Sequence, residues 1–406
     1  MSRVCAGAVA VTLLLGSGIT GAPAQPEARD DAHLNTLRQM GRDPVEFVVD
    51  ALQRHDLIIF DDALHNAVEP FEFYQALLRD ARINTQVRYV FLETLSIAAQ
   101  PHLDAYLESP TADRTLLSKA FQDDYSGYGW RYETYLDLLS TVWKINRALP
   151  EGRRIRVVGV DQPIYWEALH TRRDYDTFQD SLVARDYFLY RTIVARLNGF
   201  RDGTKAFFLT NTRHAYMRLR SREGRLHWNA AAFFDQHEPG RALSVRIHNV
   251  TLYVEAPAPT GARISTQGME RYVYRWARME EGAWDRAFAR NGNRPVAIPL
   301  GDNPFGRATY VGNIMLDVRA DQTMADAYDA LVFLAPLEQL RVSAHMDFFY
   351  TPAFREELKR RIRLLEGDGL AALLSKEGVV TLDELVDTVT KYQPQGRNTL
   401  VDSARP

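Results

Sequence analysis

The chain has 406 residues, a formal net charge of −3 and a hydrophobic fraction of 46%. A chain of this length and composition can bury an ordinary hydrophobic core. Positive and negative side chains are interspersed and no block of basic residues occurs, which argues against nucleic-acid binding and against anchoring to a charged membrane surface.

The first residues have the pattern of a secretory signal peptide. Arg3 gives a short positive region, Val4 to Leu15 is almost unbroken apolar sequence, and "APA" at 22–24 is a small-x-small cleavage site. The apolar run is too short for a membrane-spanning helix, and no later segment has the required length. We therefore predict that residues 1–24 are removed at export, which leaves a periplasmic or extracellular protein without a membrane span.

The cysteine content excludes several kinds of site. The one cysteine, Cys5, precedes the apolar run and leaves with the predicted signal peptide. The mature chain would then have no disulfide, no cysteine-based zinc site and no cysteine nucleophile.

Short apolar runs alternate with longer amphipathic segments. The runs are β-branched or aromatic and are bounded by charged or turn residues, which is typical of buried parallel strands: Leu57–Phe60, Tyr89–Leu92, Ile155–Val160 and Ala206–Leu209. The segments between them have helical spacing: Glu72–Ala81, Gly127–Leu149 and Tyr175–Leu197. Further strands are predicted at Leu243–Tyr253, Val296–Leu300 and Ala330–Ala335. This alternation predicts an α/β fold with a mostly parallel sheet and helices on both faces.

The later part of the chain predicts additions to this core. We expect residues 30–220 to form the first part of the core, 221–292 an insertion or lid, 293–350 the last core strands, and 351–406 a helical tail. The insertion is indicated by clustered aromatic residues and the broken stretch "APAPTGA". The tail is rich in Leu with alternating charge, and its last residues, with Pro394 and Gly396, are expected to fray.

Polar side chains follow each strand of the first half at the point where it ends. Because parallel strands point the same way, these ends meet at one edge of the sheet, where open α/β proteins bind ligands. The side chains concerned are Asp61, Asp62 and His65 after the first strand, Glu93 after the second, Asp161 after the third, and Asn211 and His214 after the fourth. The sequence therefore predicts a site at this edge.

Several of these residues have a structural alternative. Asp62 could be the N-cap of the following helix. His65 and His214 could be ordinary core or surface histidines. Asp161 could cap the loop into "QPIYW".

Glu93 is harder to explain structurally. It ends an apolar run, so its carboxylate would be partly buried and would need a cation or hydrogen-bond donors. His65, His214 or an arginine could supply these. Arg185 and Asp186, at the start of a predicted helix, could be an ordinary solvated surface pair. Arg185 could instead bind Glu93 or a substrate oxyanion if its helix lies over the acidic edge.

At these residues the chain resembles the superfamily that joins erythromycin esterases, ChaN-like haem-binding proteins and Tiki-type proteases. Its members carry Gly-Glu-x-x-His after the first strand, Glu after the second, an Arg-Asp helix start, and His after the fourth. The matching stretches here are "FDDALHNAVEPFEF", "VFLETL", "VARDYFLYRTIVARL" and "LTNTRHAYM". Where the family has Gly-Glu, this chain has Asp61-Asp62, so either Asp62 takes the role of the Glu or the chemistry is altered or lost.

The leading hypothesis is a hydrolase of esters or amides that resembles the erythromycin esterases in mechanism and needs no cofactor. His65 would act as general base on a water, oriented by Asp62 or Glu93. His214 and Arg185 would stabilise the oxyanion. The remaining residues would contact substrate or support these groups: Asp61, Asp161 and Asn211. No Gly-x-Ser-x-Gly elbow occurs, which argues against a serine hydrolase of the α/β-hydrolase type.

A second hypothesis uses the same side chains as metal ligands. The Tiki-like resemblance implies a divalent metal such as zinc, manganese or cobalt. Its ligands would be His65, His214, Glu93 and Asp62.

A third hypothesis is non-covalent haem binding, as the ChaN-like resemblance implies. The aromatic residues of the predicted insertion could then form a platform for a flat ligand: Trp228, Phe233, Phe234 and Tyr253. The sequence does not identify the substrate, which would be a small molecule or a peptide.

Overall fold

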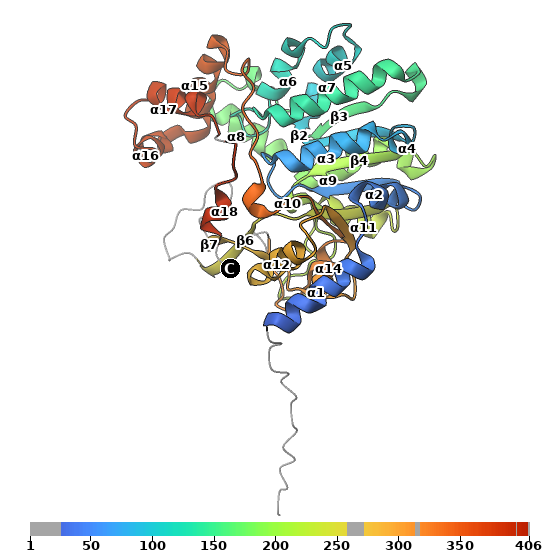
Figure 1. The fold of residues 1–406 in the computed structure, drawn as a ribbon. Coiled ribbons are helices and arrows are strands. Elements are labelled where there is room, and N and C mark those ends of the chain that lie inside the picture. Colours follow the sequence, from blue (N-terminus) through green and yellow to red (C-terminus); the bar gives the residue numbers. More distant parts are fainter. Residues whose placement is uncertain (1–25, 258–271, 313–316, 395, 405–406) are drawn as a thin grey trace, which may run out of the picture.

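The apolar runs form a seven-stranded sheet in the order β3-β2-β4-β1-β5-β9-β8, in a computed structural model that describes residues 26–257, 272–312, 317–394 and 396–404 (Figure 1). Strands β1 to β5 and β9 run parallel, and β8 runs antiparallel to β9. Their bounds are β1 Leu57–Asp61, β2 Val87–Ser96, β3 Arg156–Asp161, β4 Lys205–Thr210, β5 Ala242–Ile247, β8 Val296–Pro299 and β9 Ala330–Phe333. The predicted α/β fold with a mostly parallel sheet is confirmed. The predicted signal peptide lies outside the described residues.

Both faces of the sheet are buried, which explains the unbroken apolar runs. In β1, Ile58 and Phe60 pack into one hydrophobic cluster, whereas Leu57 and Ile59 pack into another on the opposite face. All four side chains are fully buried. Since no face of the strand meets water, apolar residues occupy every position and not every second one.

Helices from different parts of the chain cover the two faces (Figure 1). One face is covered by α2 Pro44–Leu52, α3 Val68–Arg79, α4 Ala81–Asn84, α5 Gln100–Glu108, α6 Ser118–Gln122 and α7 Glu133–Ala148. The other is covered by α1 Pro26–Met40, α9 Arg185–Arg196, α10 Thr212–Ala215, α11 Ala230–His237, α12 Ala283–Arg290, α13 Pro304–Arg307 and α14 Met324–Ala327. None of the helices in the described residues has the length and apolar character needed to span a bilayer.

Residues 221–292 do not form one insertion. Strand β5 comes from this segment and lies inside the sheet between β1 and β9. The predicted strand Leu243–Tyr253 is in fact two strands, β5 and β6 Thr251–Pro257, and β6 pairs with β7 Tyr272–Ala277 in a separate antiparallel ribbon. The prediction included β5 in a longer strand, and the polar residues of β5 find their partners elsewhere in the fold. The Ser244 hydroxyl, for example, donates to the Ala215 carbonyl at 2.6 Å.

The tail is helical, as predicted, and it returns to the body of the protein. Its helices are α15 Pro352–Glu366, α16 Leu370–Lys376, α17 Leu382–Lys391 and α18 Leu400–Ser403. The described residues near the end of the tail contact the body, contrary to the expected fraying: Val342 N–H donates to the Gly396 carbonyl at 2.7 Å, and Val401 packs with Val250. The predicted helix Tyr175–Leu197 is likewise two helices, α8 Arg172–Ser181 and α9.

Candidate active site

The chain turns sharply after β1 and brings His65 back onto Asp62. Asp62 N–H donates to the Thr210 carbonyl of β4 at 3.0 Å, and Ala63 follows with a positive φ of 59°. The His65 Nδ1 atom then lies 3.0 Å from Asp62 Oδ2. Helix α3 is preceded by Ala67, which makes no side-chain cap. The interpretation of Asp62 as a helix cap is therefore wrong, because its carboxylate binds the imidazole.

Glu93 lies between two imidazoles at the carboxyl end of the sheet. Its Oε2 is 3.1 Å from His65 Nε2, and its Oε1 is 3.4 Å from His214 Nε2. Each imidazole is held from behind by a further carboxylate, His65 by Asp62 and His214 by Asp186, whose Oδ1 is 2.7 Å from Nδ1. The result is a continuous chain of alternating carboxylates and imidazoles.

Arg185 supplies a permanent positive charge to this chain. Its guanidinium donates to Glu93 Oε1 and to both oxygens of Asp161, with Nη2 at 2.7 Å from Asp161 Oδ2. Its Nη1 is 3.2 Å from His214 Nε2. Asp161 also accepts from Gln162 N–H at 2.8 Å, so it both caps its loop and holds Arg185.

Asn211 fixes the other side of His65. Its Oδ1 accepts from Arg213 N–H at 2.9 Å and caps α10, which turns its Nδ2 toward His65 Nε2 at 2.7 Å. The Tyr135 hydroxyl is 3.3 Å from Nδ1. Assigned from this network, the neutral ring carries its proton on Nδ1 and accepts at Nε2.

The buried charges set the protonation of both imidazoles. Burial by itself lowers the pKa of His65, but the Asp62 and Glu93 carboxylates outweigh it and raise the pKa to about 10. In the same way Asp186 and Glu93 overcome burial and raise the pKa of His214 to about 9. Burial raises the pKa of Glu93, but Arg185 and His214 outweigh it and hold this pKa well below its ordinary value. The cluster is stable in this buried place because its charges neutralise one another.

Asp61 has different hydrogen-bond partners from the other predicted site residues. Its Oδ2 accepts from the Arg246 guanidinium and the Tyr328 hydroxyl, both at 2.6 Å. Its Oδ1 accepts from Ala63 N–H at 2.8 Å. Asp61 therefore does not touch the imidazoles, and instead holds Arg246 in place.

A cavity of about 240 Å³ opens at this edge of the sheet. His65 and Asn211 line it together with Arg213 and Arg246, but Glu93, Arg185 and His214 do not. The His65 side chain is 13% exposed, against 5% for His214 and 3% for Glu93. A ligand in this cavity would thus meet His65, with the other charged groups behind it.

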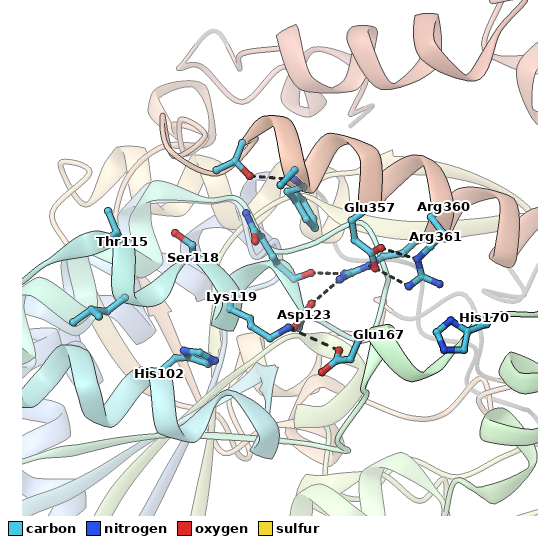
Figure 2. Close-up of a pocket in the computed structure, with 15 residues that line it drawn as sticks. His102, Thr115, Ser118, Lys119, Asp123, Glu167, His170, Glu357, Arg360 and Arg361 are labelled. Carbon is cyan, nitrogen blue, oxygen red and sulfur yellow. Dashed lines mark hydrogen bonds and ion pairs between the residues drawn. The ribbon is translucent and has the colours of Figure 1, made fainter.

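A second cavity of about 650 Å³ lies between α6 and α15 (Figure 2). Its charged side chains pair with one another: Arg361 with Asp123 at 2.6 Å, and Arg360 with Glu357 at 2.7 Å. Lys119 approaches Asp123 at 2.5 Å. The Arg361–Asp123 pair joins the tail to the body, and the other two pairs each lie within one helix and its cap. Although this cavity is larger, these charged side chains are already paired. We therefore place the candidate site at the smaller cavity.

The acidic and imidazole side chains of the site are the groups that could hold a metal ion. In the part of the chain that the structure describes, no three acidic, imidazole or thiol side chains are arranged to hold a metal ion. The Arg185 guanidinium already lies against Glu93 and His214.

The aromatic residues proposed as a haem platform lie in different parts of the structure and differ in burial. Phe234 is fully buried in the core, whereas Trp228 is 49% exposed and stacks on Phe233 with ring centroids 4.7 Å apart. Tyr253 is exposed on β6. These residues do not make one surface for a flat ligand.

Some site residues were not found from the sequence. Asp186 adjoins Arg185, and this pairing was the signal that could have identified it. Tyr135, Arg246 and Tyr328 come from α7, β5 and the loop before β9, where no local pattern separates them from ordinary core or surface residues.

Comparison with known proteins shows that this chain shares its fold with a solved structure. No family model and no curated protein sequence matches the chain. Among solved structures, a succinoglycan biosynthesis protein matches at a TM-score of 0.52 and 7% identity, covering 75% of this chain and 97% of that one. An erythromycin esterase mutant in an open conformation matches at 0.44 and 12% identity, over 71% and 92% of the two chains. The haem-binding ChaN of Campylobacter jejuni matches at 0.31 and 14% identity, over 57% and 91%.

Proposed function

We propose that this protein is an exported hydrolase that cleaves an ester or amide bond with a water activated by His65. One observation carries the proposal: His65 opens onto the cavity while its Nδ1 is held by the Asp62 carboxylate at 3.0 Å. The second nitrogen, Nε2, lies 2.7 Å from Asn211 Nδ2 and 3.1 Å from Glu93 Oε2 at the edge of this cavity, so it acts as a general base once a water replaces the Asn211 amide as its partner. The motif resemblance to erythromycin esterases points to the same class of reaction.

The proton transfers can be followed at named atoms. His65 Nε2 takes a proton from water, and the resulting hydroxide attacks the carbonyl carbon to give a tetrahedral oxyanion. Once Nε2 is protonated it no longer accepts from Asn211, whose Nδ2 is then free to donate to the oxyanion. The imidazolium returns its proton to the leaving alcohol or amine as the carbon–oxygen or carbon–nitrogen bond breaks, which leaves a carboxylic acid.

His214 and Arg185 have a positioning role in this scheme. They were expected at the oxyanion, but they lie behind Glu93 and outside the cavity lining. We propose that they hold the Glu93 carboxylate beside His65. Asp161 and Asp186 fix Arg185 and His214 in turn.

We propose that the reaction proceeds without a metal. The positive charge that a metal would bring to Glu93 and His214 is supplied here by Arg185. Elemental analysis of the purified protein checks this: a stoichiometric divalent metal, whose removal by a chelator abolishes hydrolysis, would contradict it.

Replacement of His65 tests the proposal directly. We expect His65→Gln to lower kcat/KM for 4-nitrophenyl butyrate by roughly 100-fold to 10,000-fold, the usual contribution of a positioned acid–base group. His102→Gln is the matched control, because His102 lines the other cavity, and it should keep its activity. Circular dichroism and a melting curve verify that both variants fold. A folded His65→Gln protein with wild-type activity would refute the mechanism.

Export is proposed from the signal-peptide pattern alone. N-terminal sequencing of the protein recovered from outside the cytoplasm should give a chain that begins at Gln25. A mature protein that retains Met1 or the apolar run would contradict this part of the proposal.

A further inference from the structure

Arg213 is the feature of the candidate site that the proposed mechanism does not use. It lies on α10 between Asn211 and His214, and its side chain is half-buried. Among the described residues its guanidinium makes no hydrogen bond or ion pair, and Asn211 caps only its backbone N–H. The neighbouring arginines are paired, Arg185 with Glu93 and Asp161 and Arg246 with Asp61. A half-buried cation without a partner is costly, so its partner is expected to come from outside the chain.

The surroundings of Arg213 place its charge at the catalytic cavity. Arg213 and His65 both line this space. Burial lowers the pKa of Arg213, while the nearby Glu93 carboxylate acts to raise it and the Arg185 charge to lower it. The guanidinium therefore lies within the electrostatic reach of the Glu93–Arg185 cluster without contacting either member.

The rest of the cavity wall has a different character. Leu64, Val250, Leu252 and Trp276 are apolar, and they share the lining with Arg213 and Arg246. Asp61 neutralises Arg246 at 2.6 Å, and Asp62 faces His65 at 3.0 Å. The charge of Arg213 is therefore the one left for a ligand among the described lining residues. The lining of the cavity thus combines one unpaired cation with apolar side chains.

We propose that the substrate carries an anionic group, a carboxylate or a phosphate, that binds the Arg213 guanidinium while an apolar part packs against Leu252 and Trp276. This inference rests on the proposed function and names the substrate class of the same site. A planar guanidinium holds either anion through two parallel hydrogen bonds. The volume of about 240 Å³ lies below the roughly 300–1,000 Å³ of pockets for drug-sized ligands. The part of the substrate that enters is accordingly small.

The contact between Arg213 and the anion would also position the scissile bond of the substrate relative to His65. Arg213 lies two residues after Asn211 on the same short turn, and Asn211 contacts His65. An anion held at this turn fixes the distance between the substrate carbonyl and His65, which is how binding energy becomes orientation.

Binding of small probes tests the inference without knowledge of the natural substrate. Benzoate, phenyl phosphate and the neutral benzamide are titrated by ligand-observed NMR into wild type, Arg213→Gln, Arg213→Lys and Arg173→Gln. Arg173, exposed on α8, is the matched control for loss of one charge. We expect at least one anion to bind, Arg213→Gln to weaken it roughly 10-fold to 100-fold, and Arg213→Lys to restore part of the affinity. The two anions distinguish a carboxylate ligand from a phosphate ligand.

The failure of this inference is distinguishable from failure of the proposed function. Equal anion binding by Arg213→Gln and wild type, or no anion binding at all, would overturn the anion site. If anions bind through Arg213 but no ester is hydrolysed, the anion site stands and the hydrolase proposal falls. If neutral esters are hydrolysed through His65 without anion binding, the hydrolase proposal stands and the anion site falls.

Discussion

Asn211 and Glu93 make opposing demands on the same nitrogen of His65. The Asn211 amide, 2.7 Å from Nε2, favours a neutral ring that accepts, whereas Glu93 Oε2 at 3.1 Å favours a proton on that atom. Asn211 cannot turn its oxygen to His65 without losing the backbone cap at Arg213. With the carboxylates dominant, the pKa of His65 is raised to about 10, so its base form is a minor species at neutral pH. The base form then increases with pH up to that value.

This balance predicts an alkaline ascending limb in the pH–rate profile. We expect kcat/KM to rise from pH 6 with an apparent pKa above 8, instead of near the ordinary histidine value of 6.5. Asn211→Asp keeps the cap but presents a carboxylate to Nε2, so the limb should move up by about one pH unit or more. Activity at pH 8 should fall by more than about tenfold, because this variant also lacks the Nδ2 donor that we propose for the oxyanion. A plateau below pH 8, or a limb that moves down in Asn211→Asp, would contradict the assignment.

An irregularity in β2 places Glu93 at the site. Strand β2 pairs with β3 up to Leu92 and Gly159, and the pairing then resumes at Ser96 and Asp161, so β2 contains extra residues here. A Cβ atom on Gly159 would lie 2.4 Å from the Ser96 carbonyl oxygen and 2.8 Å from that of Leu95. The absence of a side chain at Gly159 is therefore what lets the bulged backbone of β2 approach β3.

We expect Gly159→Ala to damage both stability and activity. The new methyl group meets backbone that cannot move aside cheaply, which should cost about 1–3 kcal/mol in the free energy of unfolding. The displaced bulge should also lower kcat by shifting Glu93. Gly152→Ala is the control, because a Cβ there meets no atom within 4 Å. Urea unfolding and ester hydrolysis measure the two effects, and identical curves for the two variants would rule out this account of β2.

Across the whole molecule, the buried charged cluster couples stability to pH. The pKa values of His65 and His214 are raised to about 10 and about 9, from 6.5. At a pH between 6.5 and these raised pKa values, both imidazoles of the folded protein keep a proton that the unfolded chain has released. The resulting stabilisation is fully present below pH 6.5 and is lost as the pH rises through 9 to 10. Glu93, with a lowered pKa, has the opposite dependence and loses its contribution in acid.

The free energy of unfolding should therefore fall as the pH is raised from 7 to 9. The expected slope is about 1.4 kcal/mol per pH unit for each proton that the folded state retains. His214→Gln, which cannot take up its proton, should reduce the slope by about half. Urea titrations at a series of pH values provide the measurement, and a stability that is constant or increases over this range would disprove the assignment of charged imidazoles.

Much of the architecture was predictable from local patterns. The strands of the first half were located because burial on both faces demands uninterrupted apolar residues, as at Leu57–Phe60. Strand β5 lies within the predicted strand Leu243–Tyr253, but its segment was assigned to an insertion because of clustered aromatic residues and the broken stretch "APAPTGA". Ser244 and Arg246 of this strand are both buried and form hydrogen bonds with residues far away in the chain. No local pattern reveals those partners.

The sequence by itself determined that acids, imidazoles and an amide would gather at one edge of the sheet, because parallel strands align their carboxyl ends. Only the tertiary structure decided which of them touch. The strand order puts β1 between β4 and β5, so Asp62, His65 and Asn211 meet, while Asp61 is drawn to Arg246 and Tyr328. Pairing and exposure depend on distances between side chains far apart in sequence, and these are fixed by packing. For the same reason the structure, and not the sequence, distinguished Arg213, without a partner among the described residues, from the paired Arg185.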